Sequence, residues 1–510
     1  MKTNKNISRR SFVKKTSIMS SGVMISNQSI YEDLFLNKSD GPYFGNGCKN
    51  GWADQNSISI WSRLTKKPNA NWKGEKFINI SKEDHKSYLS KLKNPKEIYK
   101  AQIPFGLKLK DMQGACIGVE GEAKIEYYPE NDKLKRNTID WKPNDSEKDF
   151  TIQWKLIGLS SNTKYIINFF SRKDKNNPIV SDSFSATFVT PPEDNVEKNI
   201  SFCIVSCHDF IRRDDFDNGH KIYPSMKKMN PDFYVHTGDI EYYDKPQPWA
   251  LTESLMRFKW NRLFALPNQK EFYNHTTSYF MKDDHDTLCN DSYPGMSYGT
   301  VAFERGVEIF DKEQFPSNEK SYKSILWGKD LQIWLLDSRN YRSRNSDPDG
   351  PEKTIWGKDQ KKWFFNTLRK SKATFKVLIS ANPILGPDRD NKSDNHANDN
   401  FKFEKEEILN ELNKCSNIYI CNGDRHWQYV TNYNNTNLWE FCCGAGTDNH
   451  QPNAWQVAKQ GVRAEHKFLR TKGGFMNVNI VKNKFGRKSI SFNHHGVDGE
   501  IVNEQKFYFK

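Results

Sequence analysis

The fold is decided by the stretch Val235-His236-Thr237-Gly238-Asp239-Ile240-Glu241-Tyr242 and by a later counterpart, Tyr419-Ile420-Cys421-Asn422-Gly423-Asp424-Arg425-His426. In both, a short apolar run ends in Gly-Asp, and another potential metal ligand follows two or three residues later. The glycine permits a sharp backbone turn. A carboxylate placed just beyond a buried strand lies where open α/β sheets bind their ligands. Two such stretches, together with further polar clusters at the ends of other apolar runs, indicate a metal-centred hydrolase.

The composition allows a large folded protein without an obvious polyanion-binding tail. The chain has 510 residues, enough for two or three domains, and 36% of them are hydrophobic. The net charge is +14, but 63 acidic residues accompany the 77 basic ones and no long basic block occurs. We therefore interpret the lysines as spread over a solvated surface. No zinc-finger spacing or RNA-binding signature is found, which predicts that no specific nucleic-acid module is present.

The nine cysteines are odd in number and irregularly spaced, so they do not indicate a disulfide framework. Several lie inside apolar runs, where cysteine usually acts as a small buried hydrophobe.

The N-terminus has the pattern of a targeting signal. Ser8-Arg9-Arg10-Ser11-Phe12-Val13-Lys14 precedes a weakly apolar stretch at 18–25 and resembles a bacterial twin-arginine export signal. We predict a signal peptide at 1–30, the twin-arginine translocase as a partner during export, and a periplasmic, cell-surface or secreted location. The alternative is a basic disordered tail. No apolar run reaches about 18 residues, so no transmembrane helix is expected.

Residues 43–190 have the pattern of an all-β sandwich domain. Apolar and polar residues alternate at 58–64 and 123–128. The stretch 159–165 resembles the corner of fibronectin-type sandwiches, in which a tyrosine packs over a turn and bonds back to it. A Lys- and Asn-rich insertion is expected to hold a short helix at Ser81–Lys93.

A different pattern follows the proline-containing break at 191–195. Apolar strands alternate with helical or loop segments, which predicts an α/β domain at 198–500. The expected strands are Ile200–Val205, Phe233–His236, Thr277–Met281, Leu331–Leu336, Phe375–Ile379, Ile418–Cys421 and Leu438–Cys442, with an antiparallel pair at Phe475–Val481 and Ser489–Phe492.

Almost every strand of this second region ends in a polar cluster. The clusters lie at 206–209, 238–242, 283–286, 337–342, 380–383 and 422–426. Each alone is ordinary, because Gly-Asp after a strand is usually a turn or a cap. Together they would bring carboxylates, a thiol, imidazoles, a phenol and amides to one sheet edge, where a cation must neutralise the charge. Hard ions prefer the carboxylates and amides, whereas the thiol, phenol and imidazole suit iron or zinc, so more than one metal is expected.

The order Cys-x-Asp, Gly-Asp-x-x-Tyr, Asp-Asp-His, Asp-x-Arg-x-Tyr-Arg, Gly-Asp-x-His resembles the alkaline phosphatase D (PhoD-like) family of calcineurin-like metallophosphoesterases. The resemblance runs from about residue 43 to the C-terminus. It implies a calcineurin-like α/β/β/α sandwich catalytic domain preceded by an all-β fibronectin-like sandwich.

The same resemblance implies a cluster of one Fe³⁺ with one or two Ca²⁺ ions. The implied iron ligands are Cys207, Asp239, Tyr242 and His426, with Asp239 bridging to calcium. Asp209 and Asp424 are the implied calcium ligands, joined by Asp284, where related enzymes use asparagine, and by Asn382.

The resemblance also implies hydrolysis of phosphate mono- or diesters by a metal-bound hydroxide, on a small or polymeric substrate. His285 would act near the leaving group, and Arg425 would face the phosphate. Arg339 either faces the phosphate or forms a structural ion pair. His208, where many members have Gln or Asn, either lines the pocket, binds a metal or supports a ligand from behind.

Two other functions remain open from the sequence. One is hydrolysis of a different anionic ester, such as a sulfate or phosphonate ester. The other is a catalytically dead surface-binding protein, which is disfavoured because every expected ligand type is retained.

Overall fold

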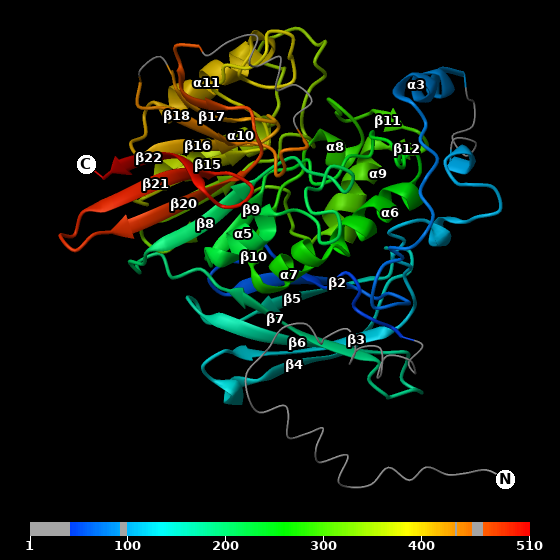
Figure 1. The fold of residues 1–510 in the computed structure, drawn as a ribbon. Helices are drawn as coiled ribbons and strands as arrows, with labels where there is room; N and C mark the ends of the chain where they lie inside the picture. Colours follow the sequence, from blue (N-terminus) through cyan, green and yellow to red (C-terminus); the bar gives the residue numbers. More distant parts are fainter. Residues whose placement is uncertain (1–40, 92–98, 434–435, 451–462, 510) are drawn as a thin grey trace, which may run out of the picture. The chain divides into compact units, whose positions relative to one another are not determined.

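The computed structural model describes residues 41–91, 99–433, 436–450 and 463–509. Two large β-sheets lie face to face, and helices cover the outer face of each sheet (Figure 1). This confirms the α/β domain predicted from the alternation of strands and helical segments, and the α/β/β/α sandwich that the resemblance implied.

The first sheet has nine strands. Strands β8, β9, β10 and β1 run parallel, and the remaining pairings are antiparallel. Their order is β22 (Ile501–Tyr508), β21 (Lys488–His495), β20 (Phe475–Lys482), β8 (Ile200–Val205), β9 (Phe233–His236), β10 (Thr277–Phe280), β1 (Cys48–Gly51), β2 (Ser57–Arg63) and β5 (Thr151–Ile157).

The second sheet has seven strands and places four of them, β14, β15, β16 and β18, in parallel. The order is β13 (Lys323–Trp327), β14 (Leu331–Leu335), β15 (Phe375–Ser380), β16 (Ile418–Asn422), β18 (Trp439–Cys443), β17 (Gln428–Asn432) and β19 (His466–Arg470). The sequence predicted the parallel strands of both sheets to within two residues, apart from β1.

The strands alternate between two cores, as the two-residue period of a strand requires. In β9, Phe233 and Val235 enter the core between the sheets, whereas Tyr234 enters the core beneath the helices. Both faces of these strands are therefore apolar, which explains why they read as continuous hydrophobic runs.

Helices complete the outer layers. The nine-stranded sheet is covered by α5 (Ile222–Lys228), α6 (Glu253–Phe264) and α7 (Pro267–His275). The seven-stranded sheet is covered by α10 (Lys358–Lys370) and α11 (Lys402–Leu412). Short elements connect β10 to β13: α8 (Asp284–Thr287), β11 (Ser297–Tyr298), β12 (Val301–Ala302), α9 (Phe303–Glu308) and η4 (Ile309–Gln314).

The predicted N-terminal sandwich shares a sheet with the predicted catalytic domain. Strands β4 (Asn137–Pro143), β3 (Glu122–Pro129), β6 (Lys164–Arg172) and β7 (Asp182–Val189) form a sheet that packs on β2 and β5. Because β1, β2 and β5 continue the nine-stranded sheet, strands from both sides of 191–195 are joined by hydrogen bonds. The domain boundary there remains a prediction. Within the insertion, helix α3 spans Lys82–Lys91, and the last two predicted positions lie outside the described residues.

The tyrosine corner is confirmed. The Ser160 backbone N–H donates a hydrogen bond of 2.8 Å to the hydroxyl oxygen of Tyr165. The Tyr165 ring stacks on Phe188, with ring centroids 5.1 Å apart. The tyrosine therefore ties the turn before β6 to the sandwich core.

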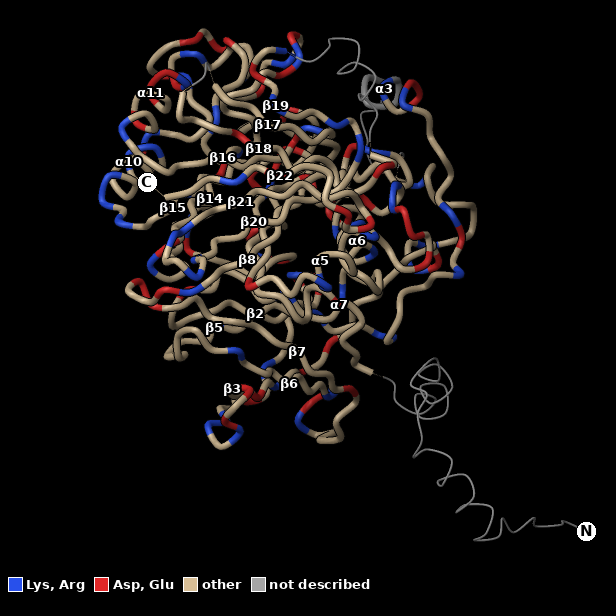
Figure 2. The backbone as a smooth tube through the Cα atoms, turned by 60° about the vertical axis from the view of Figure 1, so that its left-hand side comes forward, with Lys and Arg blue, Asp and Glu red and all other residues tan. Residues whose placement is uncertain are grey.

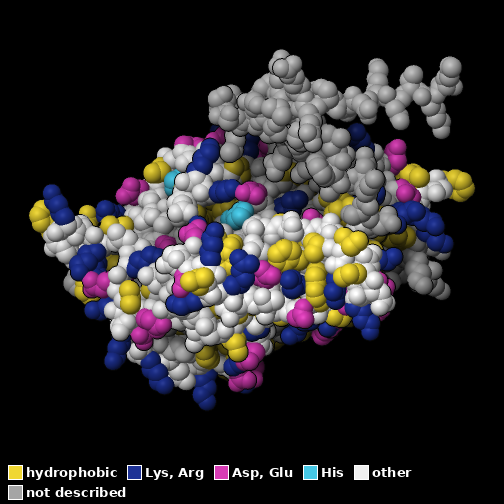
Figure 3. Space-filling view, turned by 90° about the horizontal axis from the view of Figure 1, so that it is seen from below, with side chains coloured by type: hydrophobic (Ala, Val, Ile, Leu, Met, Phe, Trp, Pro, Cys, Tyr) yellow, Lys and Arg dark blue, Asp and Glu magenta, His cyan; other side chains and the backbone are white. Residues whose placement is uncertain are grey.

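Charges of both signs are interspersed along the backbone and over the face drawn in Figure 3 (Figures 2 and 3). All nine cysteines are free thiols, as the irregular spacing predicted. No helix within the described ranges is both long and apolar enough to cross a membrane.

Replacement of Tyr165 by phenylalanine removes the hydroxyl that accepts from Ser160. We expect the Tyr165→Phe variant to lose about 1 kcal/mol of unfolding free energy, because one backbone N–H loses its partner. Urea denaturation would measure this loss. Tyr508→Phe is the matched control, because Tyr508 is 41% exposed. Equal stability of both variants would contradict the role of the corner.

Candidate metal centre

Five predicted ligands lie just beyond strands of the two sheets. Cys207 follows β8, Asp239 follows β9, Asp284 follows β10, Asn382 follows β15 and Asp424 follows β16. Because these parallel strands end at one edge, their loops converge there. Ligand atoms of Cys207, Asp239 and His426 lie within 4.8 Å of one another, and so do those of Asp239, Asp284 and His285. The structure thus brings together residues spread over more than two hundred positions.

Three of these residues have backbone conformations that side chains rarely adopt. The φ angles are +45° for Cys207, +56° for Asp239 and +61° for Asp424. Left-handed non-glycine residues cost about 1 kcal/mol or more each and concentrate at functional sites. Each strand therefore turns abruptly at the residue whose side chain enters the cluster.

The glycines of the two Gly-Asp pairs permit a close approach of the loops. A Cβ atom at Gly238 would lie 2.7 Å from the backbone nitrogen of Asp283. A Cβ atom at Gly423 would lie 2.2 Å from the Thr237 hydroxyl oxygen. The repeated glycine is thus explained by contact between neighbouring loops.

Asp286 holds two of the loops together from beneath. Its buried carboxylate accepts backbone hydrogen bonds from Asp239 (2.6 Å), Ile240 (2.8 Å) and Asp283 (2.9 Å). The burial of this carboxylate raises its pKa to about 7, although the backbone hydrogen bonds oppose the shift. Asp286 fixes where Asp239 points and was not predicted as a site residue.

One side of the cluster offers a thiol, a phenol and an imidazole around Asp239. The Tyr242 hydroxyl donates to Asp239 Oδ2 at 2.9 Å and lies 3.4 Å from Nε2 of His426. The Cys207 thiol donates to the same Oδ2 at 3.6 Å. Burial raises the pKa of the Cys207 thiol and lowers that of His426, so without a cation the thiol is protonated and the imidazole neutral.

The other side offers carboxylates and an amide. Asp239, Asp283 and Asp424 form a group with carboxylate oxygens within 4.8 Å of one another. The side-chain nitrogen of Asn382 contacts Asp283 at 3.1 Å and Asp424 at 3.3 Å. Asp283 stood beside Asp284 in the quoted motif, but the sequence did not show which of the two faced the other carboxylates.

Two observations show that this cluster fits metal ions. Oδ1 of Asp239 and Oδ1 of Asn382 are buried and have no hydrogen-bond partner among the described residues. Burial, followed by the charges of Asp284 and Asp283, raises the pKa of Asp239 well above its ordinary value. A cation would give both oxygens a partner and would neutralise the crowded carboxylates. Soft and hard donors on opposite sides fit two different ions.

His285 is held by a carboxylate that the sequence did not single out. Its Nδ1 lies 2.6 Å from Oδ1 of Asp244, and its ring packs on Tyr242 with centroids 4.2 Å apart. Burial opposes ionisation of Asp244, but the neighbouring His285 lowers the pKa of that carboxyl below its ordinary value. Asp244 lies only two residues beyond Tyr242, yet nothing in the motif distinguishes it from a surface loop residue.

Three other predicted residues are held in ion pairs. Asp209 binds Arg212 at 2.6 Å and does not enter the groups of converging ligand atoms. Arg339 binds Asp283, which is the structural alternative that the sequence left open. Arg425 binds Asp388 at 3.1 Å and contacts Asp424.

Two buried histidines lie next to the cluster. His208 contacts the carbonyl oxygen of Ile240 at 3.0 Å and the hydroxyl of Tyr223 at 2.6 Å, so it supports the loop after β9 from behind. His450 packs edge-on against His426 with centroids 4.3 Å apart, and neither of its ring nitrogens has a partner among the described residues. It follows β18 in a loop without a recognisable motif.

Comparisons with known proteins agree with the geometry. The family model described as PhoD-like phosphatase matches residues 308–499. Alkaline phosphatase D of Bacillus subtilis (strain 168) is 22% identical over 290 residues, which cover 46% of this chain. The matched region spans about half, 47%, of that curated relative.

Two solved structures share the fold. The structure of PhoD has a TM-score of 0.66 at 16% identity and covers 93% of this chain and 92% of its own. The purple acid phosphatase PPD1 from yellow lupin (Lupinus luteus) seeds has a TM-score of 0.57 at 11% identity and covers 90% of this chain and 74% of its own. The family match over residues 308–499, the curated relative and the order of the motifs agree, and they show that this chain is similar to PhoD-like phosphatases.

Proposed function

We propose that the chain is a metal-dependent phosphoesterase that hydrolyses phosphate mono- or diesters. The observation that carries the proposal is the convergence of Cys207, Tyr242 and His426 with several carboxylates on the single side chain of Asp239. This mixture of ligands at the carboxyl ends of parallel strands matches what the motif order implies for the family.

The two sides of the cluster support different ions. Iron is proposed at Cys207, Asp239, Tyr242 and His426, and calcium at Asp239, Asp424, Asp284 and Asn382. Asp283 is added to the calcium side because its carboxylate lies within reach of Asp239 and Asp424. When bound, such ions polarise a phosphoryl oxygen and activate water near neutral pH.

His285 is proposed to give a proton to the leaving group. Asp244 takes the hydrogen bond from Nδ1, which leaves Nε2 as the ring atom that can donate to a departing alkoxide. The Asp244 carboxylate also fixes the orientation of the ring through this contact.

The arginines have indirect roles in this proposal. Arg425 is tied to Asp388 and Asp424 and adds positive charge beside the carboxylates. Arg339 positions Asp283 through its ion pair. Asp209 orients Arg212, whose guanidinium lies over the ring of Tyr242 with its central carbon 4.8 Å from the ring centroid.

Export by the twin-arginine route is a separate part of the proposal and rests on residues 8–14. That route carries folded proteins, which suits a centre whose thiol must stay reduced until the metal binds. The signal lies outside the described residues.

Asp239→Asn removes the charge shared by both sides of the cluster. We expect loss of bound iron and calcium by elemental analysis, and a fall in kcat/KM of more than about 100-fold on a chromogenic phosphoester. Asp498→Asn is the control, because its side chain is 70% exposed. Full activity of Asp239→Asn would refute the centre, and faster hydrolysis of a sulfate ester than of phosphate esters by the wild type would refute the substrate class.

Asp244→Asn tests the proton donor through the residue that positions it. We expect kcat to fall by about 10- to 100-fold with KM and metal content unchanged. The loss should be larger for esters with a poorly acidic leaving group, because these depend most on proton donation. An equal loss for all leaving groups would show that Asp244 has only a structural role.

Replacement of Arg9 and Arg10 by lysine tests export. Because the twin-arginine pair is the recognised feature, we expect the double variant to accumulate in the cytoplasm. Cell fractionation with an antibody to the chain would measure this. Unchanged export of the variant would show that the N-terminus is not a twin-arginine signal.

A further inference from the structure

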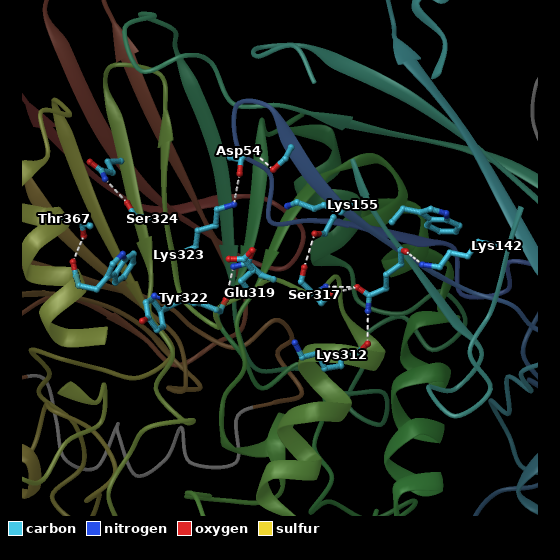
Figure 4. A pocket seen from close by; sticks show the side chains of 18 residues that line it. Asp54, Lys142, Lys155, Lys312, Ser317, Glu319, Tyr322, Lys323, Ser324 and Thr367 are labelled. Atoms are coloured by element: carbon cyan, nitrogen blue, oxygen red, sulfur yellow. Dashed lines mark hydrogen bonds and ion pairs between the residues drawn. The ribbon is translucent and has the colours of Figure 1, made fainter. Parts of the chain in front are cut away.

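A large groove lies away from the metal centre, between the edges of the two main sheets. Its volume is about 1,100 Å³. Strand β5 is the edge strand of the nine-stranded sheet and β13 is the edge strand of the seven-stranded sheet, and residues of both line the groove (Figure 4). Four strand spacings separate β5 from β9, which places this groove about 19 Å along the sheet from the strand that carries Asp239.

The groove is strongly basic. Of its eighteen lining residues five are lysines and two are acids, so its formal charge is +3. Lysine and arginine together make up 77 of the 510 residues of the chain, so basic residues are about twice as frequent in the groove. The lysines come from β4, β5, η4, the loop before β13, and β13 itself: Lys142, Lys155, Lys312, Lys320 and Lys323 (Figure 4).

Most of this charge is not neutralised by the protein. Lys323 binds Asp54 at 3.0 Å. The other four lysines have no carboxylate within 4.0 Å among the described residues, and Lys142 instead donates to the carbonyl oxygen of Gln153. Partial burial and then the positive charge of Lys323 lower the pKa of Lys155, and the negative charges of Asp54 and Glu319 oppose this shift without cancelling it, so the two ammonium groups repel each other. An anion between them would relieve this repulsion.

The kind of charge indicates the kind of anion. Within the described ranges of the chain, no arginine lines the groove. Lysine acts as a point charge with rotatable donors, so its ammonium group can meet the phosphate groups of a chain from several directions, without the fixed planar geometry that the arginine fork requires. The volume lies at the upper limit of the roughly 300–1,000 Å³ of pockets for small ligands, so the groove has room for a long ligand. Both features favour an extended ligand that carries many phosphate groups.

We propose that this groove binds a linear polyphosphate chain at a site separate from the metal centre. Such a site would anchor the protein on a phosphate-rich polymer while the metal centre remains free. The sequence did not indicate this site, because its lysines are distributed over residues 142–323 and never form a block. The proposal goes beyond the hydrolytic function and does not depend on it.

The test is equilibrium binding of long-chain inorganic polyphosphate to the full protein at several salt concentrations. We expect the double variant Lys155→Gln/Lys312→Gln to bind about tenfold more weakly. The slope of log K against log salt should fall by roughly 1.4, since two phosphate contacts are lost. Both side chains are exposed, so the fold should not change. Glu319→Gln removes a repelling charge and should tighten binding several-fold.

The matched control is Lys173→Gln/Lys175→Gln, which removes the same charge from an exposed loop of the sandwich. If this control weakened polyphosphate binding as much as the groove variant does, the proposal would be overturned, because polyphosphate would then respond only to the net charge of the protein. Heparin binding of equal strength and with the same dependence on Lys155 and Lys312 would overturn the preference for phosphate. Hydrolysis of a small chromogenic phosphoester should be unchanged in both double variants. If the wild-type protein did not hydrolyse this ester, the proposed hydrolytic function would be refuted, whereas the proposed polyphosphate site would still stand on the binding data.

Discussion

Several carboxylates are buried together at one edge of the two packed sheets, and their mutual repulsion is the constraint that explains how the site is arranged. Asp239, Asp283, Asp284 and Asp424 are nearly or largely enclosed, and water cannot fully screen their mutual repulsion. The protein limits this repulsion with Arg339 on Asp283 and Arg425 on Asp424. Asp239 has no such arginine among the described residues, and it is the carboxylate on which thiol, phenol and imidazole converge. The carboxylate of Asp239 is therefore the group next to which we expect cations to bind.

Much of the fold could be predicted because each buried strand carries its own signal. Strands β8 and β9 have apolar residues on both faces and end in a glycine or a polar cluster, so their bounds could be read directly. Strand β22 could not be found in this way. Its alternation is weak, because most of its residues are partly or fully exposed at the sheet edge. Its position depends on pairing with β21, a contact that local patterns do not encode.

Some site residues could be predicted from the sequence motifs. Others could not, because their role depends on which groups they contact in the folded protein. Cys207, Tyr242 and His426 were assigned through the order of the motifs that resembles the PhoD-like family, and the structure brings all three to Asp239. Carboxylates are ambiguous by comparison. Asp209 and Asp283 both stand in predicted clusters, yet one faces Arg212 and the other faces the centre. Their different contacts depend on residues distant in sequence or on loop conformation, which the local pattern of residues does not encode.

The shared nine-stranded sheet has a consequence for how the protein is made. Strand β20, near the C-terminus, inserts beside β8 and pairs Met476 with Ile204 across more than 270 residues of sequence. Cys207 lies directly beyond β8, so its surroundings are complete only after nearly the whole chain has left the ribosome. Strand pairings between residues so distant in sequence form slowly, because the chain loses the entropy of closing a long loop before the new contacts stabilise it. The surroundings of Cys207 thus depend on a strand that is among the last to be synthesised, so we expect the centre to be completed only after synthesis of nearly the whole chain.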